Sequence, residues 1–573
     1  MAYQAGWAKR NLGIRARGYA MQGYAQWEHR ARGEESPLYA RALFVADNAG
    51  AAVVFCCLDL GYVTHAMRDG VCQRLLEEMG AAFREEAFVL TCTHTHSGPG
   101  GCSHDVLYNL VTPGFIPGHV QSIVEACSEA ILEAWRSAAP TELRLQSDAF
   151  ADALPVAWNR SLAAYNRNPD VNPRTTSEAH LALNRQMQVL SLHRDGQLLS
   201  LLSLFGVHAT CVSSSQKKHD GDNKGYAASH TEEQLSSAQN PEPVAIFAQA
   251  TAGDVSPHYH GPGQEKRRRA IRGKAEYAYA HHNGQLQGEL ALSLGHYGKH
   301  SSLNGSIDAV FTYVDFTREH ADPRFANGHR DARTSEPCHG VSFFTGTPVD
   351  GVGMPKALGL VASRLAKGLR QYRLHSISSL EKRAEYKTLY AAQGPKDILL
   401  EAGRKQILGQ ELAALKLPDF ADPLVKELKR QARIGAIKNS ALVPTVLPLQ
   451  IIRIGQIAIV CCPGEFTTTA GQRVVESVQE VLQKQGVQQV LICTYCNDYM
   501  GYVTTFEEYQ EQAYEGGHTI FGQWTLAAFQ TRFDQLAHEL GKPEAERCHD
   551  RNTRPTPAPI DELKLRSDLP PPA

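Results

Sequence analysis

Apolar residues in this chain gather in short runs that alternate with longer segments of helical periodicity. The runs are rich in Val, Ile and Leu, and they predict buried β-strands at 51–60, 87–92, 187–192, 198–207, 244–250, 449–460 and 489–494. Between them, apolar residues recur every three or four positions, which predicts helices at 66–79, 120–137, 270–293, 356–371, 471–484 and 524–540. This alternation indicates an α/β fold in which mixed β-sheets are covered by helices.

Two segments depart from this pattern. Residues 379–441 are rich in Lys, Glu, Gln and Ala, and they predict a charged helical segment that either packs on the core or forms a lid. Residues 546–573 are rich in proline, which predicts a disordered tail.

Composition excludes several classes of protein. The 573 residues include 58 Lys and Arg and 60 Asp and Glu, so no excess of positive charge favours a nucleic-acid partner. The N-terminus lacks the apolar stretch of about 7–15 residues that a signal peptide needs. No run approaches the ~20 apolar residues of a transmembrane helix. Thirteen cysteines, many inside apolar runs, predict reduced, buried thiols, and these features together predict a cytoplasmic protein.

The segment THTHSGPGG at 93–101 contains the strongest candidate chemistry. His94 and His96 lie two apart where a predicted strand gives way to a loop of Gly and Pro. Side chains two apart on an extended segment point to the same side, so both imidazoles can face one centre. An isolated pair of this kind is more often a pair of hydrogen-bonded surface histidines, so the assignment depends on the rest of the chain.

Further polar residues follow the predicted strands at their ends. His94 follows the run at 87–92, His208 the run at 198–207, Ser256 the run at 244–250, Glu465 the run at 449–460 and Tyr502 the run at 489–494. Sites in α/β folds form outside one edge of a sheet, where loops vary while the sheet stays rigid. The sequence therefore predicts one pocket, with a metal site at converging strand ends.

Taken whole, THTHSGPGG resembles the signature of the neutral/alkaline non-lysosomal ceramidases, zinc-dependent amidases that cleave the N-acyl bond of ceramide. The resemblance continues from about residue 90 to residue 520, through blocks at 159–161, 207–208, 222–227, 253–257, 463–468 and 501–505. It implies that residues 1–545 form the family's catalytic domain. By the same resemblance, we expect this chain to lack the β-sandwich domain that follows in full-length members.

The resemblance implies that a single zinc ion per chain is bound by His94, His208, Glu465 and Tyr502. Imidazole and carboxylate groups are ordinary zinc ligands by their own chemistry. Tyr502 is an unusual ligand because a phenol has a pKa near 10, so its assignment rests on the resemblance.

The remaining site residues are also implied by the resemblance. Ser256 is the expected catalytic serine, either as the nucleophile toward the acyl carbon or as an aid to a zinc-bound water. His96, Arg160 and Tyr514 lie where the family places groups that bind the scissile amide and the substrate hydroxyls. The glycine-rich stretch at 346–353 resembles a family loop, and it is not a P-loop because no lysine follows its glycines.

The predicted function is zinc-dependent hydrolysis of a ceramide-type N-acyl amide, giving a fatty acid and a sphingoid base. One alternative is an amidase of the same family that acts on a more soluble N-acyl compound, and a weaker one is a non-catalytic binding protein. The charged segment at 381–441 has no aromatic-rich stripe. We therefore expect a preference for water-soluble or short-chain substrates over long-chain ceramide in a bilayer.

Overall fold

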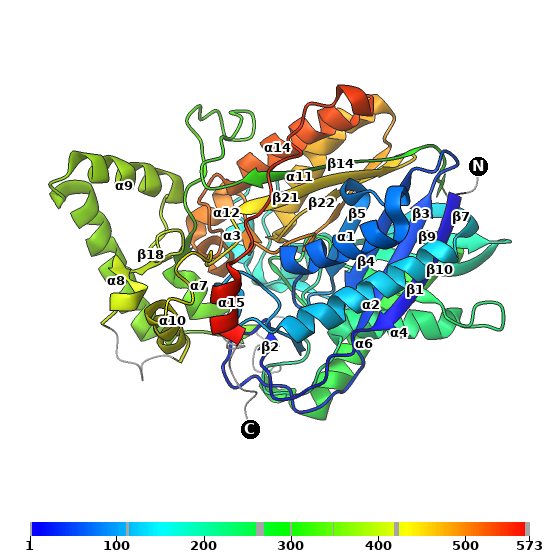
Figure 1. Ribbon diagram of the computed structural model, residues 1–573, viewed down its shortest axis with the longest axis horizontal. Coiled ribbons are helices and arrows are strands. Elements are labelled where there is room, and N and C mark those ends of the chain that lie inside the picture. The colour runs from blue at the N-terminus through cyan, green and yellow to red at the C-terminus, as the bar shows by residue number, and fades with distance from the viewer. Residues whose placement is uncertain are drawn as a thin grey trace.

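The computed structural model describes residues 3–109, 114–258, 269–297, 301–347, 349–416 and 423–567. Two β-sheets with their helices form the body of the molecule, and a smaller lobe lies at its side (Figure 1). The helices of this lobe are α7 (Val341–Thr345), α8 (Lys356–Gln371), α9 (Leu380–Gln393) and α10 (Pro423–Arg433).

The larger sheet has the strand order β11-β10-β9-β7-β1-β3-β4-β5, with β13 (Ser301–Ser302) paired to β7. The β4–β5 and β10–β11 pairs are parallel, and the pairs between them are antiparallel, so the sheet is mixed. Its main strands are β1 (Tyr3–Asn11), β3 (Tyr39–Ala46), β4 (Ala52–Leu58), β5 (Phe88–Cys92), β7 (Ala139–Ala149), β9 (Gln186–Arg194), β10 (Gln197–Leu204) and β11 (Val244–Ala248).

Helices cover this sheet in two pairs. The helices α1 (His65–Met79) and α2 (Pro117–Arg136) pack together, and α2 packs on β1 and β3. The helices α4 (Asp222–Leu235) and α6 (Lys274–Tyr297) pack together over the strands from β9 to β11.

The smaller sheet has the order β14-β21-β22-β24, with α11 and α14 packed against each other and against its strands. Both sheets contribute to one apolar core, in which Phe55 of β4 and Ile451 of β21 belong to the same cluster. The bounds are β14 (Ile307–Asp315), β21 (Val446–Ile454), β22 (Ile457–Cys461), β24 (Gln489–Cys493), α11 (Thr468–Leu482) and α14 (Thr525–Leu540).

The predicted α/β fold of mixed sheets covered by helices is confirmed. Each predicted helix is present, and the run at 449–460 proves to be a hairpin of two strands, β21 and β22. Gly455 turns this hairpin at φ +57°, where an added Cβ would lie 2.2 Å from the Asn304 carbonyl oxygen. The predicted runs do not include β1, β3, β7, β14 or α4. In α4 the apolar pattern is interrupted by polar residues that are buried, among them Asp222, Asn223 and Lys224.

The charged segment at 379–441 is only partly helical, which corrects the prediction. The helices α9 and α10 lie within it, but between them three short strands form a sheet with β15 (Cys338–Gly340), in which only the first of the three pairs directly with β15. The first of these strands, β18 (Ile398–Glu401), is apolar and mostly buried, so it joins a sheet rather than a solvated helix.

The prediction of a disordered tail is wrong for its described part. Residues 560–567 form α15 (Ile560–Ser567), whose Glu562 accepts hydrogen bonds from the backbone amides of Asn439 and Ser440 at 2.7 and 2.9 Å. Arg566 is buried and donates to the carbonyl oxygen of His104. These polar anchors fix a segment that its proline content predicts to be mobile. Residues 568–573 lie outside the described residues.

Burial of the thiols agrees with the sequence, since twelve of the thirteen cysteines are buried and Cys548 is exposed. In the described part of the chain, no helix combines the length and the apolar composition that crossing a bilayer requires.

Candidate metal centre and active site

Three histidines come together where the loops after β5 and β10 meet. A parallel bridge between Thr95 and Ala209 joins these loops, and it places His94 and His96 beside His208. One ring nitrogen from each of the three histidines lies within 4.8 Å of the others. His94 adopts φ +64°, so the two histidines of the motif converge through a turn rather than along an extended strand.

A carboxylate and a phenol complete this cluster. Glu465 and Tyr502 are direct neighbours in the short parallel pair of β23 (Glu465–Phe466) and β25 (Tyr502–Val503). The Glu465 carboxylate lies 3.5 Å from His94 Nε2 and 3.0 Å from His208 Nε2. The Tyr502 oxygen lies 3.3 Å from His208 Nε2. The loops of both sheets therefore bring all four predicted ligands to one point.

The far side of two imidazoles is fixed by backbone carbonyl groups. His94 Nδ1 lies against the Gly61 oxygen, and His208 Nδ1 lies 2.7 Å from the Ala252 oxygen. A neutral imidazole that donates from Nδ1 presents a bare lone pair at Nε2. Two such lone pairs, a carboxylate and a phenol oxygen face one another here, an arrangement of acceptors that a cation would satisfy.

Burial and charge set the ionisation of this cluster. Burial by itself raises the pKa of Glu465, but His94 and His208 lower it well below its usual value, so the carboxylate is anionic. Burial lowers the pKa of His208 and thereby favours the neutral imidazole. Burial and the nearby Glu465 charge raise the pKa of Tyr502 well above 10.

Two tyrosines that the sequence analysis missed support Glu465. Tyr499 donates its hydroxyl to Oε1 at 2.5 Å, and Tyr495 donates to Oε2 at 3.2 Å. Both tyrosines lie in the loop between β24 and β25 and are buried. No motif signals them, although their position between a predicted strand and the predicted ligand Tyr502 places them near the site.

Ser256 lies beside the histidine cluster in β12 (Val255–Ser256) and is buried. Its hydroxyl donates to Asp350 Oδ1 at 2.9 Å, and the Thr210 hydroxyl donates to the same oxygen at 3.1 Å. Asp350 lies in the turn between β16 (Gly346–Thr347) and β17 (Gly351–Val352), within the glycine-rich stretch that the sequence analysis identified only as a loop. The structure thus adds a carboxylate to the predicted site.

Arg160 connects these groups, and its side chain is 2% exposed. Nη1 donates to Asp350 Oδ2 at 2.9 Å, Nε donates to Glu515 Oε1 at 3.0 Å, and Nη2 donates to the oxygens of Gly253 and Tyr502. Burial raises the pKa of Asp350, but Arg160 and nearby histidines outweigh burial and lower it below its usual value. Arg160 therefore lies in the site, as predicted, and keeps Asp350 ionised.

His96 and Tyr514 lie at the edge of the cluster. His96 Nε2 is 3.1 Å from His94 Nε2, and its Nδ1 has no hydrogen-bond partner among the described residues. Burial lowers the pKa of His96 well below 6.5, so the ring is neutral. Tyr514 is partly exposed, and its ring centroid is 5.4 Å from that of Tyr502. The structure thus brings all eight predicted site residues together.

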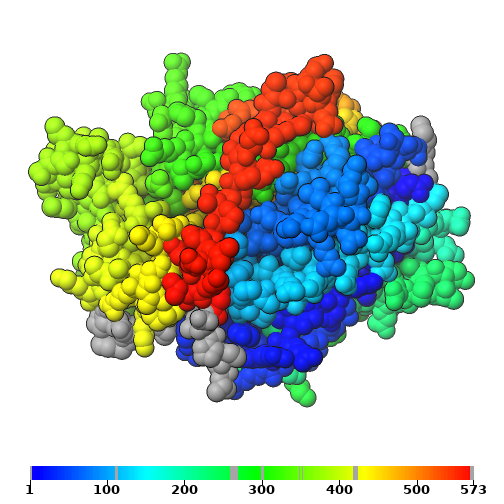
Figure 2. Space-filling model, viewed as in Figure 1, coloured from blue at the N-terminus to red at the C-terminus, as the bar shows by residue number. Residues whose placement is uncertain are grey.

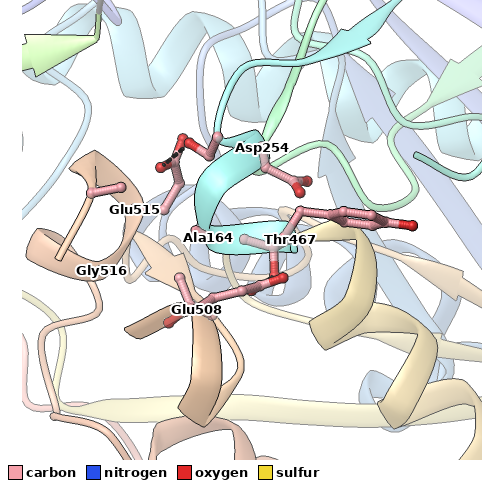
Figure 3. Close-up of a pocket in the computed structure, with 10 residues that line it drawn as sticks. Ala164, Asp254, Thr467, Glu508, Glu515 and Gly516 are labelled. Atoms are coloured by element: carbon pink, nitrogen blue, oxygen red, sulfur yellow. Dashed lines mark hydrogen bonds between the residues drawn. The ribbon is translucent and has the colours of Figure 1, made fainter. Parts of the chain in front are cut away.

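A small cavity behind Arg160 is lined by Asp254, Glu508 and Glu515 among other residues (Figure 3). Asp254 accepts hydrogen bonds from the Thr468 backbone amide and hydroxyl, and it also accepts one from Asn159. Burial and the Glu508 charge raise its pKa to about 7. Asp254 therefore ties the loop of Ser256 to α11. None of the three histidines lines this cavity, which supports the site from behind.

A buried set of imidazole, carboxylate and phenol groups beside a serine that is hydrogen-bonded to a carboxylate is the kind of site that metal-dependent hydrolases use. The comparisons with known proteins agree with this class. Residues 3–411 and 429–531 match the model of the neutral/alkaline non-lysosomal ceramidase family, N-terminal part. The chain belongs to this family, whose members hydrolyse the amide bond of ceramide.

Individual relatives give the same result. The chain is 32% identical to the neutral ceramidase of Pseudomonas aeruginosa, over 94% of this chain and 72% of the relative. It is 29% identical to the neutral ceramidase of Mycobacterium tuberculosis, over 93% of this chain and 77% of the relative. The crystal structure of the Pseudomonas aeruginosa enzyme matches with a TM-score of 0.76 at 29% identity, covering 99% of this chain and 77% of that one.

Proposed function

We propose that this chain hydrolyses the N-acyl amide of ceramide-type substrates with one zinc ion, held by His94, His208, Glu465 and Tyr502. The observation that supports this best is the convergence of acceptor atoms. Glu465 lies within 3.5 Å of both imidazole Nε2 atoms, and backbone carbonyls hold the opposite nitrogens. Nitrogen and oxygen ligands in a compact, buried set fit zinc, and hydrogen bonds to the outer nitrogens are typical of metal-ligating histidines.

His96 is also close enough to ligate, but its contacts support a different role. No backbone carbonyl holds its Nδ1, and its closest site partner is His94 rather than Glu465. Ligating histidines are normally held on the far nitrogen, as His94 and His208 are. We therefore assign His96 to substrate binding, together with Tyr514, which lies partly exposed at the edge of the site.

When bound, zinc acts as a Lewis acid that polarises the scissile carbonyl and lowers the pKa of a water molecule or hydroxyl beside it. The chain supplies the remaining functions. Asp350 holds the proton of the Ser256 hydroxyl, so that the lone pairs of Oγ are free to face the acyl carbon or a water molecule. Both choices for the attacking oxygen agree with this geometry.

Arg160 positions neighbouring groups and also contributes a positive charge next to the substrate. Its hydrogen bonds to Asp350, Glu515, Gly253 and Tyr502 occupy most of its N–H groups. A fixed cation at this position stabilises negative charge that develops on the reacting oxygens, because it needs no reorganisation during the reaction.

The proposed function is tested with purified protein and a short-chain ceramide, following release of the free sphingoid base. We expect release that stops after chelation and returns with added zinc, and no release by Ser256→Ala. Failure of the zinc-loaded protein to release any base from ceramides or from other N-acyl amides would refute the proposal.

A further inference from the structure

The surface of the lobe has an unusual apolar face on α8. Twelve large apolar residues are exposed in the described part of the chain, and half of them lie between positions 358 and 380. They are Leu358, Leu360, Val361, Leu365, Tyr372 and Leu380. Figures 1 and 2 place α8 on the outer part of the lobe, away from the two sheets.

The helix α8 is oriented with its small residues inward. It buries Gly359, Ala362 and Ala366, whereas Leu358 and Leu365 are 56% and 55% exposed. Helices of soluble proteins normally turn their large apolar side chains to the core. Contiguous exposed apolar surface of this kind marks an interaction site.

Charge identifies the partner. Lys356, Arg364 and Lys367 are exposed on the same helix, and no Asp or Glu occurs in the sequence between Asp350 and Glu381. One of these cations is partly balanced, since Lys367 Nζ lies 3.5 Å from Asp397. The whole chain has a net charge of only −2, so this local excess of cations is specific to the lobe. An apolar stripe beside basic residues is typical of helices that lie in the interface of an anionic membrane.

The same segment leads to the candidate active site. Gly359 packs so closely on α7 that an added Cβ would lie 2.8 Å from Thr345. In α7, the ring of Phe343 is 5.5 Å from that of Tyr514, which in turn contacts Tyr502. The turn between α7 and α8 also carries Asp350, the partner of Ser256. Contacts through α7 thus join the buried side of α8 to the reacting groups.

We propose that α8 docks this protein on the surface of an anionic lipid bilayer, with Leu358, Val361, Leu365 and Tyr372 in the acyl region and the cations at the headgroups. Docking places the lobe side of the site toward the bilayer in which a long-chain amide resides. Membrane binding itself needs no catalysis. The proposal rests on the proposed function only for the claim that docking gives the active site access to a ceramide-type substrate in the bilayer. It runs against the expected preference for water-soluble or short-chain substrates, which was drawn from the charged segment at 381–441.

The first test is sedimentation of the full-length protein with vesicles, without substrate. We expect binding to vesicles of phosphatidylcholine with phosphatidylglycerol, weaker binding at high salt, and little binding to phosphatidylcholine alone. Absence of binding to the anionic vesicles would overturn the proposal.

Variants locate the surface. The double substitution Leu358→Gln with Leu365→Gln should lower the vesicle partition coefficient about ten-fold or more, because both side chains lose apolar burial. The matched control is Leu76→Gln on α1, an exposed leucine outside the lobe, which should bind as the unmodified protein does. Equal binding by the double variant and the control would overturn the assignment to α8. So would a double variant that changes the oligomeric state in gel filtration, since the face would then be a contact between copies.

Kinetics separate this proposal from the proposed function. The double variant should keep kcat/KM for a water-soluble short-chain ceramide and lose activity on long-chain ceramide in anionic vesicles. An unmodified protein that binds vesicles but hydrolyses neither substrate would refute the proposed function and leave docking intact. Equal activity of variant and unmodified protein on the vesicle substrate would show that α8 does not deliver it.

Discussion

The histidine cluster and the α8 face depart from the usual distribution of polar and apolar residues in opposite ways. At the cluster, imidazoles, carboxylates and a guanidinium are buried, and each is held by neighbours. On α8, leucines are exposed while glycine and alanines are buried. Buried polar groups destabilise a fold unless they are paired, and exposed apolar patches promote association. The comparison indicates that one region is built for a cation and a substrate, and the other for a lipid surface.

Among substitutions at the histidine cluster, removal of the Ser256 hydroxyl should lower kcat the most. We expect Ser256→Ala to fold and to bind zinc, but to lose on the order of 10³-fold or more in kcat, since the hydroxyl contacts the reacting centre. The measurement is steady-state hydrolysis of a short-chain ceramide with zinc content determined in parallel. A variant with nearly unchanged kcat would make Ser256 only a turn residue.

Neutralising the Asp350 carboxylate should cause the second-largest loss of kcat. Asp350→Asn keeps the size of the side chain but removes the charge that pairs with Arg160, and we expect a loss of roughly 10²–10³-fold in kcat with zinc retained. The matched control is Asp195→Asn, in the exposed turn between β9 and β10, which should leave the kinetics unchanged. Rates for Asp350→Asn close to those of the control would remove Asp350 from the mechanism.

Removal of the Tyr499 hydroxyl, which donates to Glu465, should have a smaller effect, and this effect should be on zinc affinity. Tyr499→Phe removes the hydrogen bond to Oε1, and we expect about 10–100-fold weaker zinc binding in a chelator competition. Tyr108→Phe is the control, because this tyrosine packs against Tyr499 and its buried hydroxyl has no hydrogen-bond partner in the part of the chain that the structure describes. Equal zinc affinity of the two variants would contradict the support that we assign to Tyr499.

The smallest effect is expected on the stability of the protein when an exposed leucine of α8 is replaced. Leu365→Gln should change the free energy of unfolding by less than about 0.5 kcal/mol, because the side chain is already exposed in the free protein. Thermal or urea unfolding in the absence of lipid measures this change. A loss of several kcal/mol would mean that Leu365 is covered in the native state, so the face would belong to a subunit contact or the core.

Periodicity predicted most of the elements that carry the site, because strands such as β5 and β22 are continuous apolar runs buried on both faces. It missed β1 and β7, where polar residues interrupt the apolar pattern. The α8 helix was predicted, but its orientation was not, since a pattern of small and large residues does not say which face meets α7. Close approach at Gly359 decides that orientation.

The candidate site was predicted through residues that lie in recognisable motifs. Asp350 was missed because it is 94 positions from Ser256 in the sequence, and only the folded turn between β16 and β17 brings them together. Tyr495 and Tyr499 were missed because a supporting hydroxyl needs no particular spacing from its acceptor. Groups that act on the ligands and the serine are thus fixed by tertiary structure, which local patterns do not encode.

The zinc content of three histidine variants tests the central claim most directly. Our assignment predicts about one zinc per chain in the unmodified protein, loss of zinc and activity in His94→Ala and His208→Ala, and retention of zinc with a lower rate in His96→Ala. Equal loss of zinc in all three variants would contradict the division between ligands and substrate-binding groups. Full turnover by protein from which all metal has been removed would contradict the metal centre itself.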